Sequence, residues 1–141
     1  MQQLTLAQAN EMIASALARA QEAGHRPMGV VVVDEAGHMK AAQRQDGASM
    51  FRLDIARGKA WAAVGMGASS RELTQRAKDL PHFFTALATA GQGKFIPQTG
   101  AVLIKDAQGH LLGAIGASGG TGDEDEAICI HGVQAAGLVA G

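Results

Sequence analysis

The spacing of apolar residues changes along the chain, and each change predicts a different element of secondary structure. Residues 5–23 place apolar side chains at every third or fourth position, which is the spacing of one buried helix face. Thr5 with Gln8 has the form of a capping box at the start of this helix. Gly24 is a suitable residue to end it.

The rest of the chain alternates between strand and helix patterns. Residues 30–33 are four consecutive valines, which predict a central strand covered on both faces. Apolar runs separated by glycine or proline predict the remaining elements: a strand at 38–44, helices at 48–64 and 69–77, an apolar helical turn around Phe83, Phe84 and Leu87, strands at 101–105 and 110–117, and a last helix over about 123–138.

Two segments of the chain repeat one pattern. Residues 30–39, VVVVDEAGHM, align without gaps with residues 102–111, VLIKDAQGHL. Both consist of an apolar run, the sequence D-x-x-G-H and another apolar residue. They lie too far apart for a solenoid repeat, so we expect two similar hairpins in one antiparallel sheet. With the helices, this order predicts an α+β fold in which helices pack against a central antiparallel sheet.

Composition narrows the class of protein. The 141 residues suit a single domain spanning 1–141, and 47% hydrophobic with 18% charged residues excludes a disordered polymer. Twelve basic and thirteen acidic residues leave no electrostatic footprint for nucleic acid. The helices are rich in alanine, and their flat surfaces favour self-association.

The N-terminal residues and the cysteine content lead to expectations about cellular location and disulfide or zinc sites. The first five residues lack the pattern of a secretory leader, and no apolar run is long enough for a membrane span, so a cytoplasmic location is expected. Cys129 is the only cysteine, which rules out an intrachain disulfide and a cysteine-based zinc site. We expect it to be an inert core residue.

The segment 111–132, LLGAIGASGGTGDEDEAICIHG, is the most informative in the chain. An apolar strand runs into a glycine-rich turn, and the turn leads to an acidic helix start. Such a turn can present backbone N–H groups beside a helix terminus, where they bind an anion or a carboxylate. The alternative is a hairpin and a helix whose connection needs glycine only for its backbone dihedrals.

This segment resembles the end of the GlcG/HbpS-like family, also known as the haem-degrading domain family or DUF336. The family pattern GAIG-S-GG, followed by an acidic pair, falls on five residues here: Ser118, Gly119, Gly120, Asp125 and Glu126. Three upstream blocks also match: the strand ending in D-x-x-G at 30–37, the R-x-D-G-A block at 44–48, and the A-x-x-K-A helix at 56–60. The resemblance covers nearly the whole chain.

The resemblance implies a profilin-like α/β/α layer fold and a homo-oligomer, from a dimer up to an octameric ring. It also implies haem or a related tetrapyrrole as the ligand, because members bind haem and others are fused to a cobalamin adenosyltransferase.

Arg44 and Asp46 follow the second predicted strand. The arginine can clamp a carboxylate in bidentate geometry, or the two residues can form a salt bridge and a helix cap. Lys59 lies in an apolar helix, so it either extends to water or faces inward toward Asp125 or a ligand carboxylate. Asp125 is the acidic residue expected to line a pocket.

The histidines differ in what their surroundings indicate. His82 lies beside Phe83 and Phe84, and this makes it the best candidate for a haem ligand, with a structural role as the alternative. His25 and His38 are expected at the surface. No metal site other than haem iron is expected.

Two main hypotheses follow for function. The first is a small-molecule-binding protein that binds haem or a related tetrapyrrole, with a pocket between the sheet end and the last helix; its cofactor-binding residues are Arg44, Asp46, His82, Ser118, Gly119 and Gly120. The second is an enzyme of the lyase, isomerase or hydrolase type acting on a small carboxylated metabolite. In it Arg44 holds the carboxylate, Asp125 acts as acid or base and Lys59 is the electrostatic partner. A purely structural interaction module is a third possibility.

Overall fold

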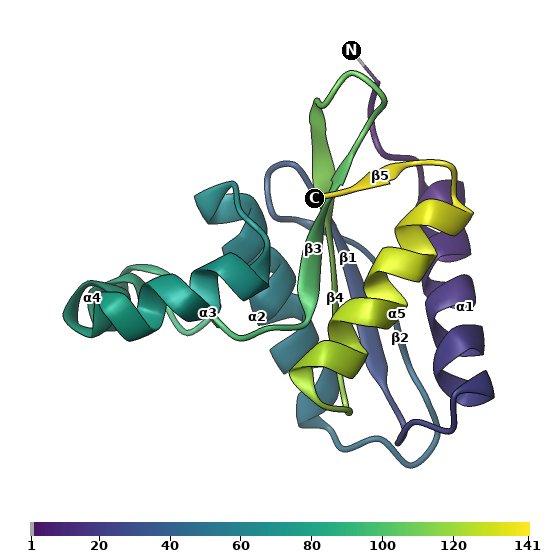
Figure 1. Ribbon diagram of the computed structural model, residues 1–141, viewed down its shortest axis with the longest axis horizontal. Helices are drawn as coiled ribbons and strands as arrows, with labels where there is room; N and C mark the ends of the chain where they lie inside the picture. The colour runs from purple at the N-terminus through teal and green to yellow at the C-terminus, as the bar shows by residue number, and fades with distance from the viewer. Residues whose placement is uncertain (1) are drawn as a thin grey trace.

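The computed structural model describes residues 2–141, and Met1 lies outside the described residues. Within them the chain forms five helices and five strands (Figure 1). In chain order these are α1 (Leu6–Glu22), β1 (Gly29–Asp34), β2 (Met39–Arg44), α2 (Phe51–Met66), α3 (Ser70–Asp79), α4 (Pro81–Ala90), β3 (Ala101–Lys105), β4 (Leu111–Ser118), α5 (Gly122–Ala135) and β5 (Val139–Ala140).

All five strands belong to one antiparallel sheet with the order β2-β1-β4-β3-β5. The two predicted hairpins, β1–β2 and β3–β4, are joined by pairing between β1 and β4, which confirms the expectation of one sheet. The four valines of β1 are fully buried, as expected of a central strand.

The end of the chain differs from the prediction. The last helix stops at Ala135 rather than near Leu138, because Gly137 turns the chain with a left-handed φ of 77°. Val139 and Ala140 then pair with the end of β3 as a short edge strand. A run of two strand residues carries no periodic signal, so the sequence did not reveal it.

Helices cover both faces of the sheet. Helices α1 and α5 lie on one face and α2 on the other, and Figure 1 shows this arrangement. The backbones come very close on both sides: a Cβ at Gly116 of β4 would lie 2.3 Å from the carbonyl oxygen of Ala56, and one at Gly132 of α5 would lie 2.5 Å from that of Met12. The α+β class and the α/β/α layering are therefore confirmed.

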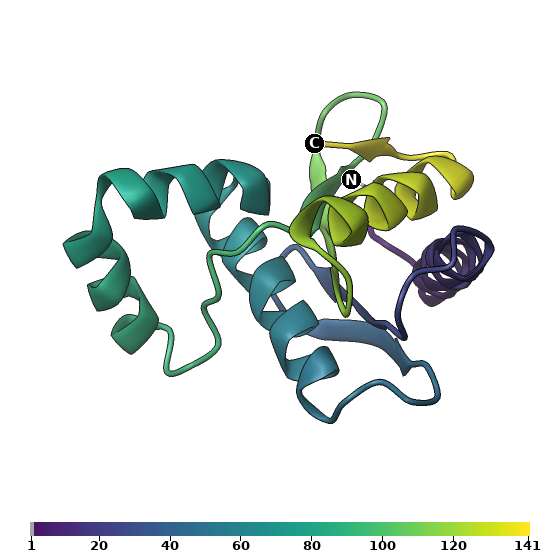
Figure 2. The same cartoon turned by 60° about the horizontal axis from the view of Figure 1, so that its bottom comes forward.

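Helices α3 and α4 project away from the sheet beyond α2, as Figure 2 shows. The apolar turn expected around Phe83 is a full helix of ten residues, which Pro81 begins at its first position. A separate small core holds this part of the molecule together; its buried residues are Ala62, Ala68, Leu73, Phe84 and Phe95.

The two D-x-x-G-H turns adopt the same structure. In one turn, Asp34 Oδ1 accepts the backbone N–H groups of Ala36 and His38, both at 3.0 Å. In the other, Asp106 Oδ1 accepts the corresponding groups at 2.9 Å. Desolvation alone would raise the pKa of Asp106, but these hydrogen bonds and the His110 ring outweigh it and lower the pKa. The internal sequence repeat therefore corresponds to two turns with the same aspartate–backbone hydrogen bonds.

Candidate functional site

Lys59 and Asp125 form a buried ion pair between α2 and α5. Lys59 Nζ lies 3.0 Å from Asp125 Oδ2, and the two side chains are only 4% and 3% exposed. The same ammonium donates to the carbonyl oxygen of Ala117 in β4 at 3.0 Å. The other carboxylate oxygen, Asp125 Oδ1, accepts the N–H of Gly120 at 2.9 Å. Of the two possibilities left open for Lys59, the structure therefore selects the inward one.

Burial dominates the electrostatics of this pair. It raises the pKa of Asp125, and the charge of Lys59 together with the N–H of Gly120 offsets only part of the rise. Both carboxylate oxygens and the ammonium already have protein partners. The pair therefore ties α2, β4 and α5 together, and neither side chain lines the pockets described below.

The other carboxylates of the acidic run have separate partners. Asp123 and Glu126 both pair with Arg71 of α3. Glu124 completes a capping box with Thr121 at the start of α5. Asp123 and Glu126, three positions apart on the helix, thus share one neighbour, whereas Glu124 and Asp125 have others, so the four carboxylates do not converge on one point.

Arg44 lies apart from the buried pair. It is exposed at the end of β2, where its Nη1 donates to the carbonyl oxygen of Ala48. Gly29 of β1 pairs with Arg44 on one side and with Ser118 on the other, so both residues reach the same end of the sheet. Ser118 Oγ accepts a hydrogen bond from Arg52 Nη1 of α2 at 3.2 Å.

His82 does not join this end of the sheet. It is exposed in the first turn of α4, on the part of the molecule that projects beyond α2 (Figure 2). Its aromatic neighbours do not form a planar slot around it: Phe84 packs into the small core, and Phe83 is 52% exposed. The structure therefore places His82 far from the other five cofactor-binding candidates.

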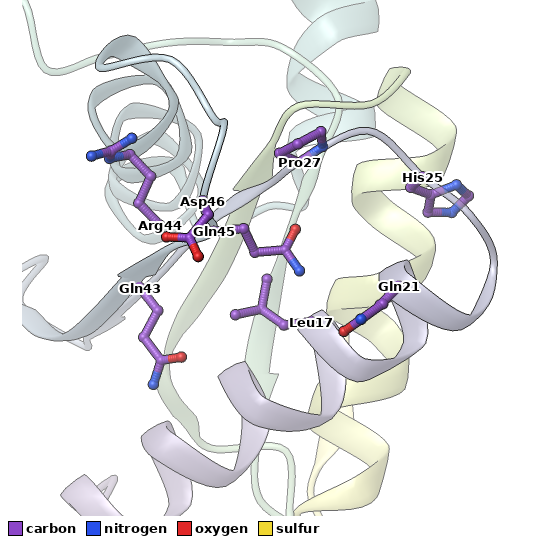
Figure 3. Close-up of a pocket in the computed structure, with 8 residues that line it drawn as sticks. All are labelled: Leu17, Gln21, His25, Pro27, Gln43, Arg44, Gln45 and Asp46. Carbon is purple, nitrogen blue, oxygen red and sulfur yellow. The ribbon is translucent and has the colours of Figure 1, made fainter.

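The sheet end carries a pocket of about 510 Å³, here named the α1–β2 pocket. Figure 3 shows its lining residues: Leu17, Gln21, His25, Pro27, Gln43, Arg44, Gln45 and Asp46. Leu17 and three glutamines occupy its centre, His25 lies at the rim beside α5, and the Arg44 side chain points away. Arg44 and Asp46, both predicted, are thus brought to one pocket.

His25 is the residue that sequence reasoning missed. It was expected at the surface, but its side chain is 17% exposed and its Nδ1 lies 3.2 Å from Glu124 Oε2. The N–H of Thr121 is the main cause of the lowered pKa of Glu124, and the charge of His25 contributes. Gly24, with φ of 73°, turns the chain toward α5 after α1. That glycine was the only local signal for the placement of His25.

A smaller pocket of about 190 Å³ adjoins the first, and Pro27 lines both. Two arginines, Arg26 and Arg52, face it together with Gly119. A Cβ at Gly119 would lie 2.3 Å from the carbonyl oxygen of Pro27, so the glycine allows the 118–120 turn to pass close to the chain before β1. The predicted glycine turn therefore belongs to the same sheet end.

Comparisons with known proteins agree with this architecture. The family model described as haem-degrading protein HbpS-like matches residues 4–134. An uncharacterized 15.0 kDa protein from the dhaT-dhaS intergenic region of Citrobacter freundii is 30% identical over 125 residues, which is 89% of this chain and 86% of that protein.

Two solved structures are similar over nearly their full length. The PduOC structure in complex with haem has a TM-score of 0.85 and 27% identity, covering 97% of both chains. A double mutant of HbpS from Streptomyces reticuli has a TM-score of 0.82 and 29% identity, covering 95% of this chain and 87% of that one.

Proposed function

The chain belongs to the family of haem-degrading HbpS-like proteins, and from this premise we propose that it binds haem in the α1–β2 pocket. The similarity to PduOC, whose structure is a haem complex, extends over the whole chain and supports this choice of ligand. The pocket volume, about 510 Å³, falls within the usual range of small-molecule sites.

The observation that carries the proposal is the His25–Glu124 contact. A metal-binding histidine usually donates one ring N–H to a carboxylate, which fixes the tautomer and leaves the other nitrogen free for the metal. Here Glu124 lies at Nδ1 of His25, so Nε2 is the nitrogen left for iron. Haem bound at this rim would supply an iron centre whose properties depend on the axial ligand.

Other groups at the sheet end suit the rest of a haem molecule. Leu17 and Pro27 offer apolar contacts for the macrocycle. Arg26 and Arg52 in the adjoining pocket offer cations for the two propionates. Arg44 lies beside the α1–β2 pocket, and its side chain would have to turn inward to add a third. Asp46 also lines the α1–β2 pocket, and Gly119 of the 118–120 turn lines the adjoining one.

The test is a haem titration followed by absorption spectroscopy. The wild-type protein should give a shifted Soret band that saturates near one haem per chain. His25→Ala should change the position of the band and weaken binding by at least tenfold, because the axial nitrogen is removed. His82→Ala is the matched control and should behave like wild type. A wild-type protein without a Soret shift, or a shift lost in His82→Ala and kept in His25→Ala, would contradict the proposal.

The buried pair does not support the alternative of an enzyme that uses Lys59 and Asp125. The two groups are bonded to each other, and both are almost fully buried. Thermal stabilisation by small organic acids without any Soret shift would favour the enzyme instead.

We also propose that the protein is a homo-oligomer. Two large apolar side chains at the start of α2 support it, because Met50 is 75% exposed and Phe51 is 58% exposed. Light scattering coupled to size exclusion should give a mass above that of one chain, and Phe51→Glu should lower it. A wild-type protein that is monomeric at all concentrations would contradict this.

The cytoplasmic location stays a prediction. Across residues 2–141, no helix has both the length and the apolar character that a membrane crossing demands.

A further inference from the structure

A second pocket lies at the other end of β1, away from the sheet end described above. Its volume is about 370 Å³, within the usual range of small-molecule sites. The turn between β1 and β2 forms one wall, α2 forms another, and Lys94 from the loop after α4 completes it. We call it the Trp61 pocket, and its lining residues are Ala36, Gly37, His38, Met39, Arg57, Trp61 and Lys94.

Two cations line this pocket without an ion-pair partner. Among the described residues 2–141, the side chains of Arg57 and Lys94 make no ion pair and no hydrogen bond. Lys94 Nζ is held over the Trp61 ring, 6.0 Å from its centroid. Two unpaired positive charges that face one concave site create a potential that attracts anions.

Trp61 adds a neutral donor to the same site. A Cβ at Gly37 would lie 3.0 Å from Trp61 Nε1, so the β1–β2 turn packs directly on the edge of the indole that carries the N–H. No acceptor for this N–H is found within residues 2–141. Trp61 is only partly buried, so its N–H is accessible at the edge of the pocket, where a ligand oxygen can accept it.

The carboxylate of Asp34, at the end of β1, is already used by the protein. Asp34 Oδ1 accepts two backbone N–H groups of its own turn, and its Oδ2 faces His38 at 3.9 Å. The carboxylate therefore stabilises the turn and does not neutralise Arg57 or Lys94.

We propose that the Trp61 pocket binds a small oxyanion ligand, whose carboxylate or phosphate group is held by Arg57, Lys94 and the indole N–H of Trp61. A planar guanidinium, an ammonium and a neutral N–H form a donor set suited to such an anion. This site shares no lining residue with the α1–β2 pocket, so it is independent of the proposed haem binding.

The protein carries its own probe, because Trp61 is its only tryptophan. Citrate and inorganic phosphate are titrated separately at constant ionic strength, and the fluorescence of Trp61 is recorded. A saturable change with citrate identifies a carboxylate ligand, and one with phosphate identifies a phosphate ligand. Arg57→Ala and Lys94→Ala should each weaken the binding of the anion that gives a response by about tenfold.

The control is Arg19→Ala, which removes an exposed positive charge from α1 and should leave the titration unchanged. Lys94 is exposed in a loop, so Lys94→Ala remains informative even if Arg57→Ala lowers stability. No saturable change with either anion, or equal weakening in Arg19→Ala, would overturn the proposal. His25→Ala should leave this titration unchanged. A failure of the anion proposal can therefore be told apart from a failure of the haem proposal.

Discussion

Lys59 and Asp125 show how a residue that looks catalytic in the sequence can serve the fold. Burying one charged side chain is costly unless it is paired, and each of these two groups is the other's partner. Removing only one of them leaves an uncompensated charge in the core, whereas removing both charges does not.

We therefore predict that Lys59→Met lowers the free energy of unfolding by about 3–5 kcal/mol. Adding Asp125→Asn should restore part of the loss, because Asn keeps an acceptor for the Gly120 N–H without the charge. Urea denaturation of the two single variants and the double variant measures the coupling. Glu72→Ala, which breaks an exposed pair with Arg76, is the control and should cost less than about 1 kcal/mol. A similar small loss for Lys59→Met would contradict a structural role.

Arg44 is the opposite case, an exposed residue for which we propose a role in binding. Within residues 2–141, the only hydrogen bond of its side chain goes to the carbonyl oxygen of Ala48. Arg44→Ala should therefore leave the melting temperature of the ligand-free protein nearly unchanged and reduce the stabilisation that haem provides. Thermal melts with and without haem measure both effects. A large loss in the ligand-free protein would show that Arg44 serves the fold.

At the scale of elements, the start of α5 makes stability depend on pH. The pKa of Glu124 is lowered from its ordinary value of 4.5, chiefly by the N–H of Thr121. The folded state therefore releases this proton more readily than the unfolded chain. The resulting stability is present above about pH 4.5 and is lost as the pH falls through the lower pKa of the folded protein.

Glu124→Gln tests this dependence, because glutamine keeps the acceptor for Thr121 and cannot ionise. The advantage of wild type over this variant in urea denaturation should be largest above pH 4.5 and should vanish in more acidic solution. Thr121→Ala is the comparison: it should cost about 1 kcal/mol and keep most of the pH dependence. An advantage of wild type that grows on acidification would disprove the assignment.

Close packing between α2 and β4 gives a second prediction at this scale. Gly116→Ala should lower stability by about 1–3 kcal/mol, because its Cβ would lie 2.3 Å from a backbone oxygen that cannot move easily. Gly65→Ala, in α2 but with no atom within 4 Å of its Cβ, should raise stability by about 0.5–1 kcal/mol. Equal effects of the two variants would refute the close approach.

At the scale of the whole molecule, the order of the strands decides which residues meet. β1 lies between β2 and β4. The end of β2 and the glycine turn that follows β4 therefore reach the same end of the sheet. That arrangement brings Arg44, Asp46 and the 118–120 turn into one region. It also places the Trp61 pocket at the opposite end of β1, so the two proposed sites share no lining residue.

The sequence predicted most of the elements because their signals are local. The helix α1 has an apolar stripe and a capping box that both form as expected, and the two D-x-x-G-H turns form the same hydrogen bonds. The misses have weak local signals: β5 has only two residues, and α4, which was assigned a single turn, buries only Phe84.

The sequence by itself determined the order of helices and strands, the α+β class and the resemblance to the family, since caps, periodicity and motif spacing act over a few residues. Only the tertiary structure decided that Lys59 and Asp125 neutralise each other, that His25 and not His82 reaches the sheet end, and that Arg57 and Lys94 share a pocket. These outcomes depend on which distant segments pack together, and the free energy of that packing is a property of the whole fold.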